Sequence, residues 1–180
     1  MIRLFVALQI PEEVRERLVA LQGGVPGARW AGSEQMHLTL RFIGEVDSNV
    51  AHDIDDALAG VRTPSFVLEL AGVGEFGGKN PRALWAGVRP NDAVLHLQKK
   101  IGTALQRIGL PPESRKFSAH VTLARMKGAP QEKIVQFLTH HALFASGPFA
   151  VSDFVLFSSH LSHNGSIYHA ERVYPLTATP

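Results

Sequence analysis

Hydrophobic and polar positions divide the chain of 180 residues into short segments, each with the periodicity of a strand or a helix. Apolar side chains that recur every three to four positions predict helices that begin near residues 11, 48, 92 and 130. Apolar or alternating runs bounded by turn residues predict strands at 1–8, 36–43, 65–70, 82–88, 117–124, 149–157 and 166–176. The glycine-rich stretch 72–78 is expected to be a flexible hairpin-type loop.

The order of these segments repeats along the chain. Strand, helix, strand and helix occur once in the first half and again in the second, and no shorter repeat is visible. This order predicts an α+β fold made of a duplicated unit with a pseudo-two-fold axis. We expect a single domain over 1–180, with one strand of each half facing its counterpart across the axis and the helices on the outer faces.

Composition limits the kind of protein. With 45% hydrophobic residues, the chain can bury a core without disulfides or metal staples. It has no cysteine, which excludes disulfides, cysteine nucleophiles and thiolate metal sites and fits a reducing compartment. The apolar start is interrupted by Gln9 and Pro11, as expected for a strand and not for a signal peptide, and no stretch approaches the ~20 apolar residues of a membrane helix. We expect a soluble, cytoplasmic monomer that does not bind membranes.

Charge adds a second limit. The net charge is only +2, which excludes a protein that binds polyanions through bulk charge, so an anionic ligand must be held locally. Arginines outnumber lysines 12 to 6, and the planar fork of arginine suits contact with two phosphate oxygens at once.

Two nearly identical segments carry the chemistry: His-Leu-Thr-Leu at 37–40 and His-Val-Thr-Leu at 120–123. A shuffled chain of this composition would contain about 0.04 copies of His-x-Thr-Leu. Both copies lie in predicted strands, where alternate side chains share a face. Each copy therefore displays a histidine and a threonine together, above two apolar residues that face a core, and we interpret the two pairs as one site.

Such a site suits displacement at phosphorus. Histidine titrates near neutrality, so two histidines can supply a base and an acid at the same pH. In an in-line substitution the attacking and leaving oxygens lie on opposite sides of phosphorus, and each needs proton transfer. Thr39 and Thr122 can donate hydrogen bonds to the oxygens that gain charge. The symmetry leaves open which of His37 and His120 is the acid.

Other interpretations of the same residues have less support. A single histidine on a strand is usually structural, but two in matched positions are not explained in this way. A zinc enzyme lacks support, since there is no His-Glu-x-x-His helix, although His160, His163 and His169 in the closing hairpin have spacings that could suit a metal. The glycine-rich stretch lacks the Gly-Lys-Ser/Thr of a phosphate loop, and no Gly-x-Ser-x-Gly elbow is present.

The paired motifs resemble those of the 2H phosphoesterases, and the segments around them resemble the RNA 2′,3′-cyclic phosphodiesterases, also called 2′-5′ RNA ligases. The resemblance covers nearly the whole chain. It includes Arg-Leu-Phe-Val-Ala-Leu at 3–8, Trp30, Leu-Trp-Ala-Gly-Val at 84–88 and Ser-His-Leu at 159–161. One departure is Ala119, where the family commonly has proline before the second histidine.

The resemblance implies a bilobal α+β fold with antiparallel sheets lining a central groove, no metal or other cofactor, and hydrolysis of terminal 2′,3′-cyclic phosphates to 2′-phosphates, with reversible 2′-5′ RNA ligation as a second activity. RNA ends or nucleoside 2′,3′-cyclic phosphates would be the ligands. His37 would be the proton donor and His120 the proton acceptor, with Thr39, Thr122 and Arg125 on the phosphate. To these we add Arg41, which shares the strand parity of His37, as a second phosphate contact, and Phe76 and Tyr168 as stacking partners for a base. A non-catalytic RNA-end binder and a metal-dependent phosphohydrolase are the alternatives.

Overall fold

Antiparallel strand pairs form a single strongly curled sheet in the computed structural model, which describes residues 1–178. Across the sheet the strands follow the order β7-β4-β5-β6-β3-β1-β8-β9, and β2 pairs with β6 from outside this path. Their bounds are β1 Ile2–Gln9, β2 Arg29–Trp30, β3 His37–Val46, β4 Phe66–Phe76, β5 Ala83–Val88, β6 His120–Arg125, β7 Ala145–Val151, β8 Asp153–Ser162 and β9 Gly165–Pro175.

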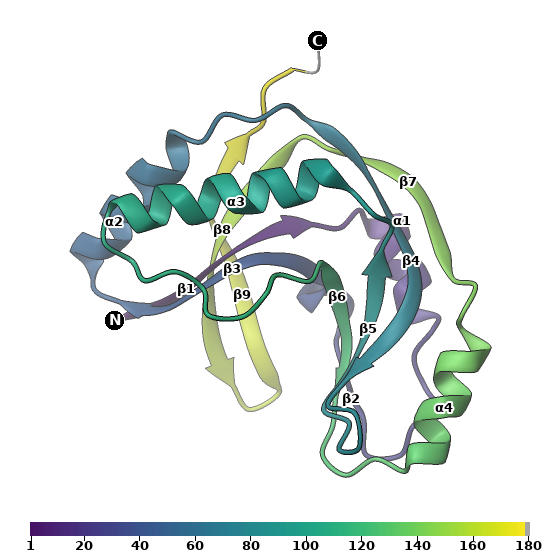
Figure 1. The fold of residues 1–180 in the computed structure, drawn as a ribbon. Helices are drawn as coiled ribbons and strands as arrows, with labels where there is room; N and C mark the ends of the chain where they lie inside the picture. Colours follow the sequence, from purple (N-terminus) through teal and green to yellow (C-terminus); the bar gives the residue numbers. More distant parts are fainter. Residues whose placement is uncertain (179–180) are drawn as a thin grey trace.

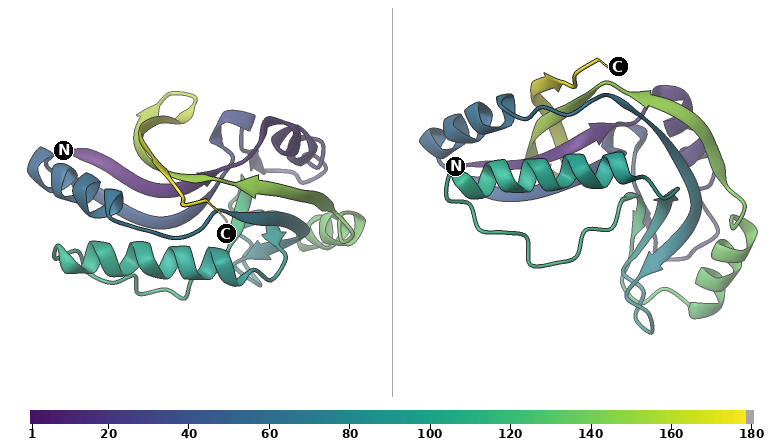
Figure 2. Two further views of the ribbon diagram at one scale, coloured as in Figure 1. Left: turned by 90° about the horizontal axis from the view of Figure 1, so that it is seen from above. Right: turned by 45° about the horizontal axis from the view of Figure 1, so that its top comes forward.

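Four α-helices pack on this sheet within the described residues: α1 Glu12–Val19, α2 Ser48–Ala59, α3 Asp92–Arg107 and α4 Gln131–His140, with a short 3-10 turn at Ser33–Gln35. α2 and α3 lie over one end of the sheet and α1 and α4 over the other (Figures 1 and 2). Asp47 and Asn91 cap α2 and α3, because their side chains accept hydrogen bonds from the amides of Val50 and Val94. None of these helices is long and apolar enough to cross a membrane.

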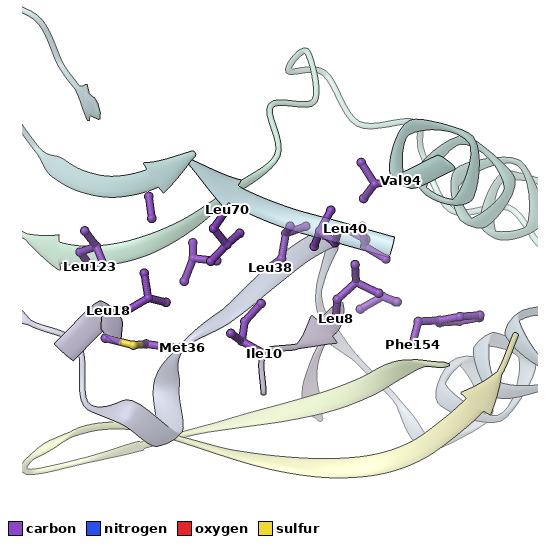
Figure 3. Close-up of a cluster of buried hydrophobic side chains, with 14 of the residues drawn as sticks. Leu8, Ile10, Leu18, Met36, Leu38, Leu40, Leu70, Val94, Leu123 and Phe154 are labelled. Atoms are coloured by element: carbon purple, nitrogen blue, oxygen red, sulfur yellow. The ribbon is translucent and has the colours of Figure 1, made fainter. Parts of the chain in front are cut away.

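The α+β class and the repeated order are confirmed. The succession β1-α1-β3-α2 is matched by β5-α3-β6-α4, and the second strand of each unit lies at the centre of the sheet. The sheets of the two halves are joined into one, because β3 pairs directly with β6. The core lies between this sheet and the helices (Figure 3), where Leu8 and Leu38 from the strands meet Leu18 of α1 and Val94 of α3.

Two predicted segments differ from the structure. The stretch 72–76, expected to be loop, continues β4, since Val73, Gly74 and Phe76 pair with β5. The predicted strand 149–157 is two strands, because the chain leaves β7 at Val151 and enters β8 at Asp153. β7 pairs with β4 and β8 with β1, so this short connection links distant parts of the sheet. Pro148 is tolerated because β7 is an edge strand.

Candidate active site

The two motifs lie side by side at the centre of the sheet. Leu38 of β3 is opposite Val121 of β6, and both side chains are fully buried in the core. Continuing this antiparallel register by one residue on each side sets the histidine of each motif across from the threonine of the other, and the charge of His120 acts on His37. His37, Thr39, His120 and Thr122 are all half-buried on the other face. The structure thus brings the four residues together in a crossed arrangement.

Each histidine ring is held by the backbone two residues before it. His120 Nδ1 lies 2.7 Å from the carbonyl oxygen of Ser118, and the His37 ring makes a backbone hydrogen bond with Gln35. A ring nitrogen that donates to a carbonyl fixes the tautomer and leaves the other nitrogen for a ligand. The matched contacts give both imidazoles the same preparation for proton transfer.

Aromatic rings enclose both histidines. The His37 ring centroid lies 4.8 Å from that of Phe5 and 5.1 Å from that of Tyr168, whose plane is almost perpendicular. The His120 centroid lies 4.9 Å from Phe76, again nearly perpendicular, and 6.2 Å from Trp85. Phe76 and Tyr168, the predicted base contacts, therefore occupy equivalent positions beside the two histidines.

Phe5 and Trp85 were not among the residues predicted for the site. Strand alternation could have identified Phe5. It lies on the same face of β1 as Ala7 and Gln9, and Gln9 pairs with His37. Trp85 is opposite Thr122, and its place depends on Gly74 across the β4–β5 pair. A Cβ at Gly74 would lie 2.1 Å from the indole ring. Only the strand pairing shows this contact.

The last residue of each motif forms a β-bulge, and the bulge decides on which face the next arginine lies. The β5–β6 pairing passes from Trp85–Thr122 to Leu84–Ala124, so Leu123 is an extra residue and Arg125 returns to the face of the site. Its positive charge acts on both histidines. Arg125 therefore lies on the same face of the sheet as the two histidines, as the predicted phosphate contact requires.

The equivalent bulge at Leu40 moves Arg41 away from the site. Pairing passes from Ala7–Thr39 to Val6–Arg41, so the expected shared parity of Arg41 and His37 does not hold. Arg41 is only 6% exposed, donates hydrogen bonds to the carbonyls of Phe42 and Pro111, and lies 3.9 Å from a carboxylate oxygen of Glu113. Its guanidinium anchors the loop between α3 and β6 and does not face the histidines.

The electrostatics of the site favour neutral imidazoles in the free protein. Burial is the largest cause and lowers the pKa of His37 to about 4; the hydrogen bond with Gln35 opposes this shift, and the charges of Arg125 and His120 reinforce it. Burial also lowers the pKa of His120, while the hydrogen bond to Ser118 raises it and the charge of Arg125 lowers it further. Arg125 therefore destabilises the protonated form of both imidazoles in the free protein.

A pocket of about 390 Å³ opens beside His37. Phe157 and Tyr168 form its aromatic side, and Arg15 and Glu34, which sequence reasoning had not selected, supply polar groups. Such a hollow can accept a planar ring against the aromatic side chains. Within residues 1–178, no three His, Cys, Asp or Glu side chains gather as a possible metal site, and this includes the three hairpin histidines.

Relatives of the chain were identified from sequence and structure. The profile of the family described as LigT like Phosphoesterase matches residues 8–85 and 88–168. An RNA 2′,3′-cyclic phosphodiesterase from Aeropyrum pernix is 38% identical over 148 residues, which cover 81% of this chain and 84% of that protein. Another from Thermotoga maritima is 35% identical over 175 residues, covering 92% and 91%.

Solved structures with the same fold include other phosphoesterases. The crystal structure of TT0787 from Thermus thermophilus superposes with a TM-score of 0.82 at 25% identity, over 98% of both chains. Escherichia coli LigT, in a complex with 3′-AMP, has the same fold, with a TM-score of 0.80 at 24% identity over 98% of both chains. Since the family profile spans most of the chain, both motifs included, the protein belongs to the LigT-like phosphoesterase family.

Proposed function

We propose that this protein is an RNA 2′,3′-cyclic phosphodiesterase that opens terminal 2′,3′-cyclic phosphates to 2′-phosphates. The observation that carries the proposal is the crossed pair of His/Thr motifs on β3 and β6, with Arg125 acting on both histidines. The Aeropyrum and Thermotoga relatives are RNA 2′,3′-cyclic phosphodiesterases, which supports the same reaction.

The proposed reaction is an in-line displacement by water. His120 accepts a proton from the water whose oxygen bonds to phosphorus, the bond from phosphorus to the 3′ oxygen breaks, and His37 donates a proton to that oxygen. Thr39, Thr122 and Arg125 bind the remaining oxygens as negative charge grows. Because the two positions are nearly equivalent in the fold, the geometry does not distinguish the acid from the base. The family resemblance supports the choice made here.

Substrate binding supplies the charge that makes His37 an acid. With a pKa of about 4, the His37 ring is neutral in the free protein at pH 7. A phosphate anion beside the ring favours the imidazolium, so we propose that His37 takes up its proton as the substrate binds. With the 5′-hydroxyl of a second RNA in place of water, the same reaction would form a 2′-5′ bond: His120 accepts the hydroxyl proton, the bond from phosphorus to the 3′ oxygen breaks, and His37 protonates that oxygen. This makes 2′-5′ ligation part of the proposal.

The remaining expectations complete this proposal. One chain over 1–180 supplies both motifs and Arg125, which supports a single domain acting as a monomer. An RNA substrate supports a cytoplasmic location. Phe76 and Tyr168 would contact the terminal base, because each stands edge-on beside a catalytic histidine. Arg41 is not included, because its guanidinium is directed elsewhere.

The test is hydrolysis of a nucleoside 2′,3′-cyclic phosphate in the presence of EDTA, with the product identified by phosphorus NMR. We expect a 2′-phosphate, and about 10²–10⁴-fold lower turnover in His37→Ala and in His120→Ala. His140→Ala, an exposed histidine at the end of α4, is the matched control and should retain full activity. Tight binding without turnover would indicate an RNA-end binder, and activity that EDTA abolishes and zinc or manganese restores would indicate a metal-dependent hydrolase.

A further inference from the structure

A hollow larger than the pocket at His37 lies between helices α2 and α3. Its volume is about 600 Å³. It is open because small residues line it where the helices meet: Ala57 and Gly60 from α2 and its end, and Ala104 from α3. α3 packs on β3 from the core side, whereas His37 of β3 and His120 of β6 lie on the opposite face of the sheet. The hollow is therefore separate from the candidate active site.

The hollow is strongly basic. On α3 its lining residues recur every three to four positions, next to the buried stripe of the helix, and they form one polar face: His96, Lys99, Lys100, Thr103 and Arg107. Arg62 adds a fourth permanent positive charge from the segment after α2. It is oriented there by hydrogen bonds to the carbonyls of Ala59 and Val61. The one acidic residue in the lining is Asp56, which lies 3.7 Å from His52.

These cations are not neutralised within the protein. The ion pairs in the part of the chain that the structure describes include neither Lys99, Lys100 nor Arg107, and Arg62 is also outside them. Four positive charges around one concavity repel one another, and a concave shape focuses their potential outward. The arrangement is costly for the free protein and favourable for a polyanion.

We propose that this groove binds the phosphate backbone of an RNA strand whose cyclic end lies at His37 and His120, an inference that rests on the proposed function. From Lys99 to Arg107 the helix rises about 12 Å, long enough to follow more than one phosphate. The lining contains no Phe, Tyr or Trp. The contact is therefore with phosphates and independent of base sequence.

Chain connectivity supports RNA over an unrelated acidic ligand. α3 ends at Arg107, and the loop 108–119 runs from there to His120 (Figure 1, between α3 and β6). This loop carries two further exposed cations, Arg115 and Lys116, and Arg41 anchors it to the sheet. The cations thus follow one continuous stretch of chain from the groove to the second catalytic histidine, the path that a strand bound at both places would need.

The test compares a nucleoside 2′,3′-cyclic phosphate with an RNA of about 20 nucleotides that has the same cyclic end. For the triple variant Lys99→Gln/Lys100→Gln/Arg107→Gln, we expect kcat/KM on the mononucleotide within twofold of wild type. On the RNA we expect KM about tenfold higher, kcat unchanged, and a salt dependence of log KM about 0.7 smaller per lost phosphate contact. Lys133→Gln, which replaces an exposed lysine on α4, is the matched control and should leave kcat and KM unchanged on both substrates.

RNA length and an unreactive end sharpen the result. Cyclic-ended dinucleotides should not respond to the triple variant, because they cannot reach the groove. The same 20-nucleotide RNA with a 3′-hydroxyl, measured by fluorescence anisotropy, should also lose about tenfold in affinity. This binding assay tests the groove even if the proposed hydrolysis fails. Equal loss on mononucleotide and RNA, or no loss on RNA, would overturn the proposal. So would polyglutamate binding that the variant weakens while RNA binding stays intact, which would indicate an acidic protein partner.

Discussion

His37 and His120 occupy equivalent strand positions but are shielded from water to different extents. His37 has three aromatic neighbours, Phe5, Phe157 and Tyr168, whereas His120 has Phe76 and Trp85. Burial lowers the pKa of both rings and brings that of His37 to about 4. In the proposed mechanism, the acid function of His37 therefore depends on a bound anion that raises its pKa.

This dependence predicts different pH profiles for kcat/KM and kcat. The first reports groups of the free enzyme, where the pKa values are lowered, so its optimum should lie below 6.5 and activity should fall as pH rises and the acid loses its proton. In the complex the bound anion raises both pKa values, so the kcat profile should lie at higher pH. Initial rates between pH 4 and 9 on a cyclic nucleotide measure both, and the apparent values belong to the coupled pair. Superimposable profiles with an optimum above pH 7 would contradict this model.

The charge of Arg125 should affect both the pH optimum and the rate of the proposed reaction. Its guanidinium lowers the pKa of both histidines, so Arg125→Gln should shift the kcat/KM optimum to higher pH. The lost contact with the phosphate should also reduce kcat/KM about 10- to 100-fold. Arg125→Lys keeps the charge but loses the fork, so it should retain the wild-type pH optimum at a reduced rate. An unchanged optimum in Arg125→Gln would show that the charge does not act on the histidines.

At the scale of elements, the sequence predicts features that depend on neighbours along the chain. The four helices, both motif strands and the His/Thr pairing follow from periodicity, caps and strand alternation. Features that depend on a partner strand do not. The bulges at Leu40 and Leu123 reverse the faces of Arg41 and Arg125, and Gly74 belongs to a strand only because β5 lies beside it. A local sequence pattern shows the periodicity of a segment, but it does not show which strand lies beside that segment or in which register the two strands pair.

Arg41 should act on stability and not on phosphate binding. Arg41→Gln removes the charged donor of two part-buried hydrogen bonds, to the carbonyls of Phe42 and Pro111, and hydrogen bonds to charged groups are worth about 1.5–3 kcal/mol. Urea unfolding should show this loss, while KM for a cyclic mononucleotide stays within twofold. Lys127→Gln, an exposed cation beyond β6, serves as the comparison and should be neutral in unfolding. A large rise in KM without loss of stability would restore Arg41 as a phosphate contact.

Substitution of Gly74 tests how the β4–β5 pair positions Trp85 and Phe76 beside His120. In Gly74→Ala the new Cβ would overlap the indole of Trp85, so the ring must move. Because Trp85 packs on Phe76 and lies beside His120, we expect a shifted tryptophan emission, about 1–3 kcal/mol lower stability and reduced kcat. Gly102→Ala is the control, since the added methyl meets nothing within 4 Å in α3 and should stabilise the helix slightly. Unchanged emission and activity in Gly74→Ala would contradict the role given to Gly74 in positioning Trp85.

At the scale of the whole molecule, the two halves of the sequence are interleaved. Arg17 of α1, from the first half, donates hydrogen bonds to the carbonyls of Ala145 and Ser146 in β7. Trp30 pairs with Ala124 of β6 and packs on Phe137 of α4. In return α3, from the second half, packs on β3. Neither half contains all the elements that cover its own strands.

Interleaving predicts that the protein unfolds as one cooperative unit, although its site lies at a junction between equivalent halves. Both tryptophans, Trp30 and Trp85, belong to the β4–β7 end, whereas Tyr168 and Tyr174 belong to β9. Tryptophan fluorescence and tyrosine second-derivative absorbance therefore report opposite ends, and we expect their urea midpoints to coincide. Activity should disappear at the same midpoint, because His37 and His120 come from different halves of the chain and meet where β3 pairs with β6. Two separate transitions, or activity lost well before either, would instead show lobes that part at the β3–β6 contact while each remains folded.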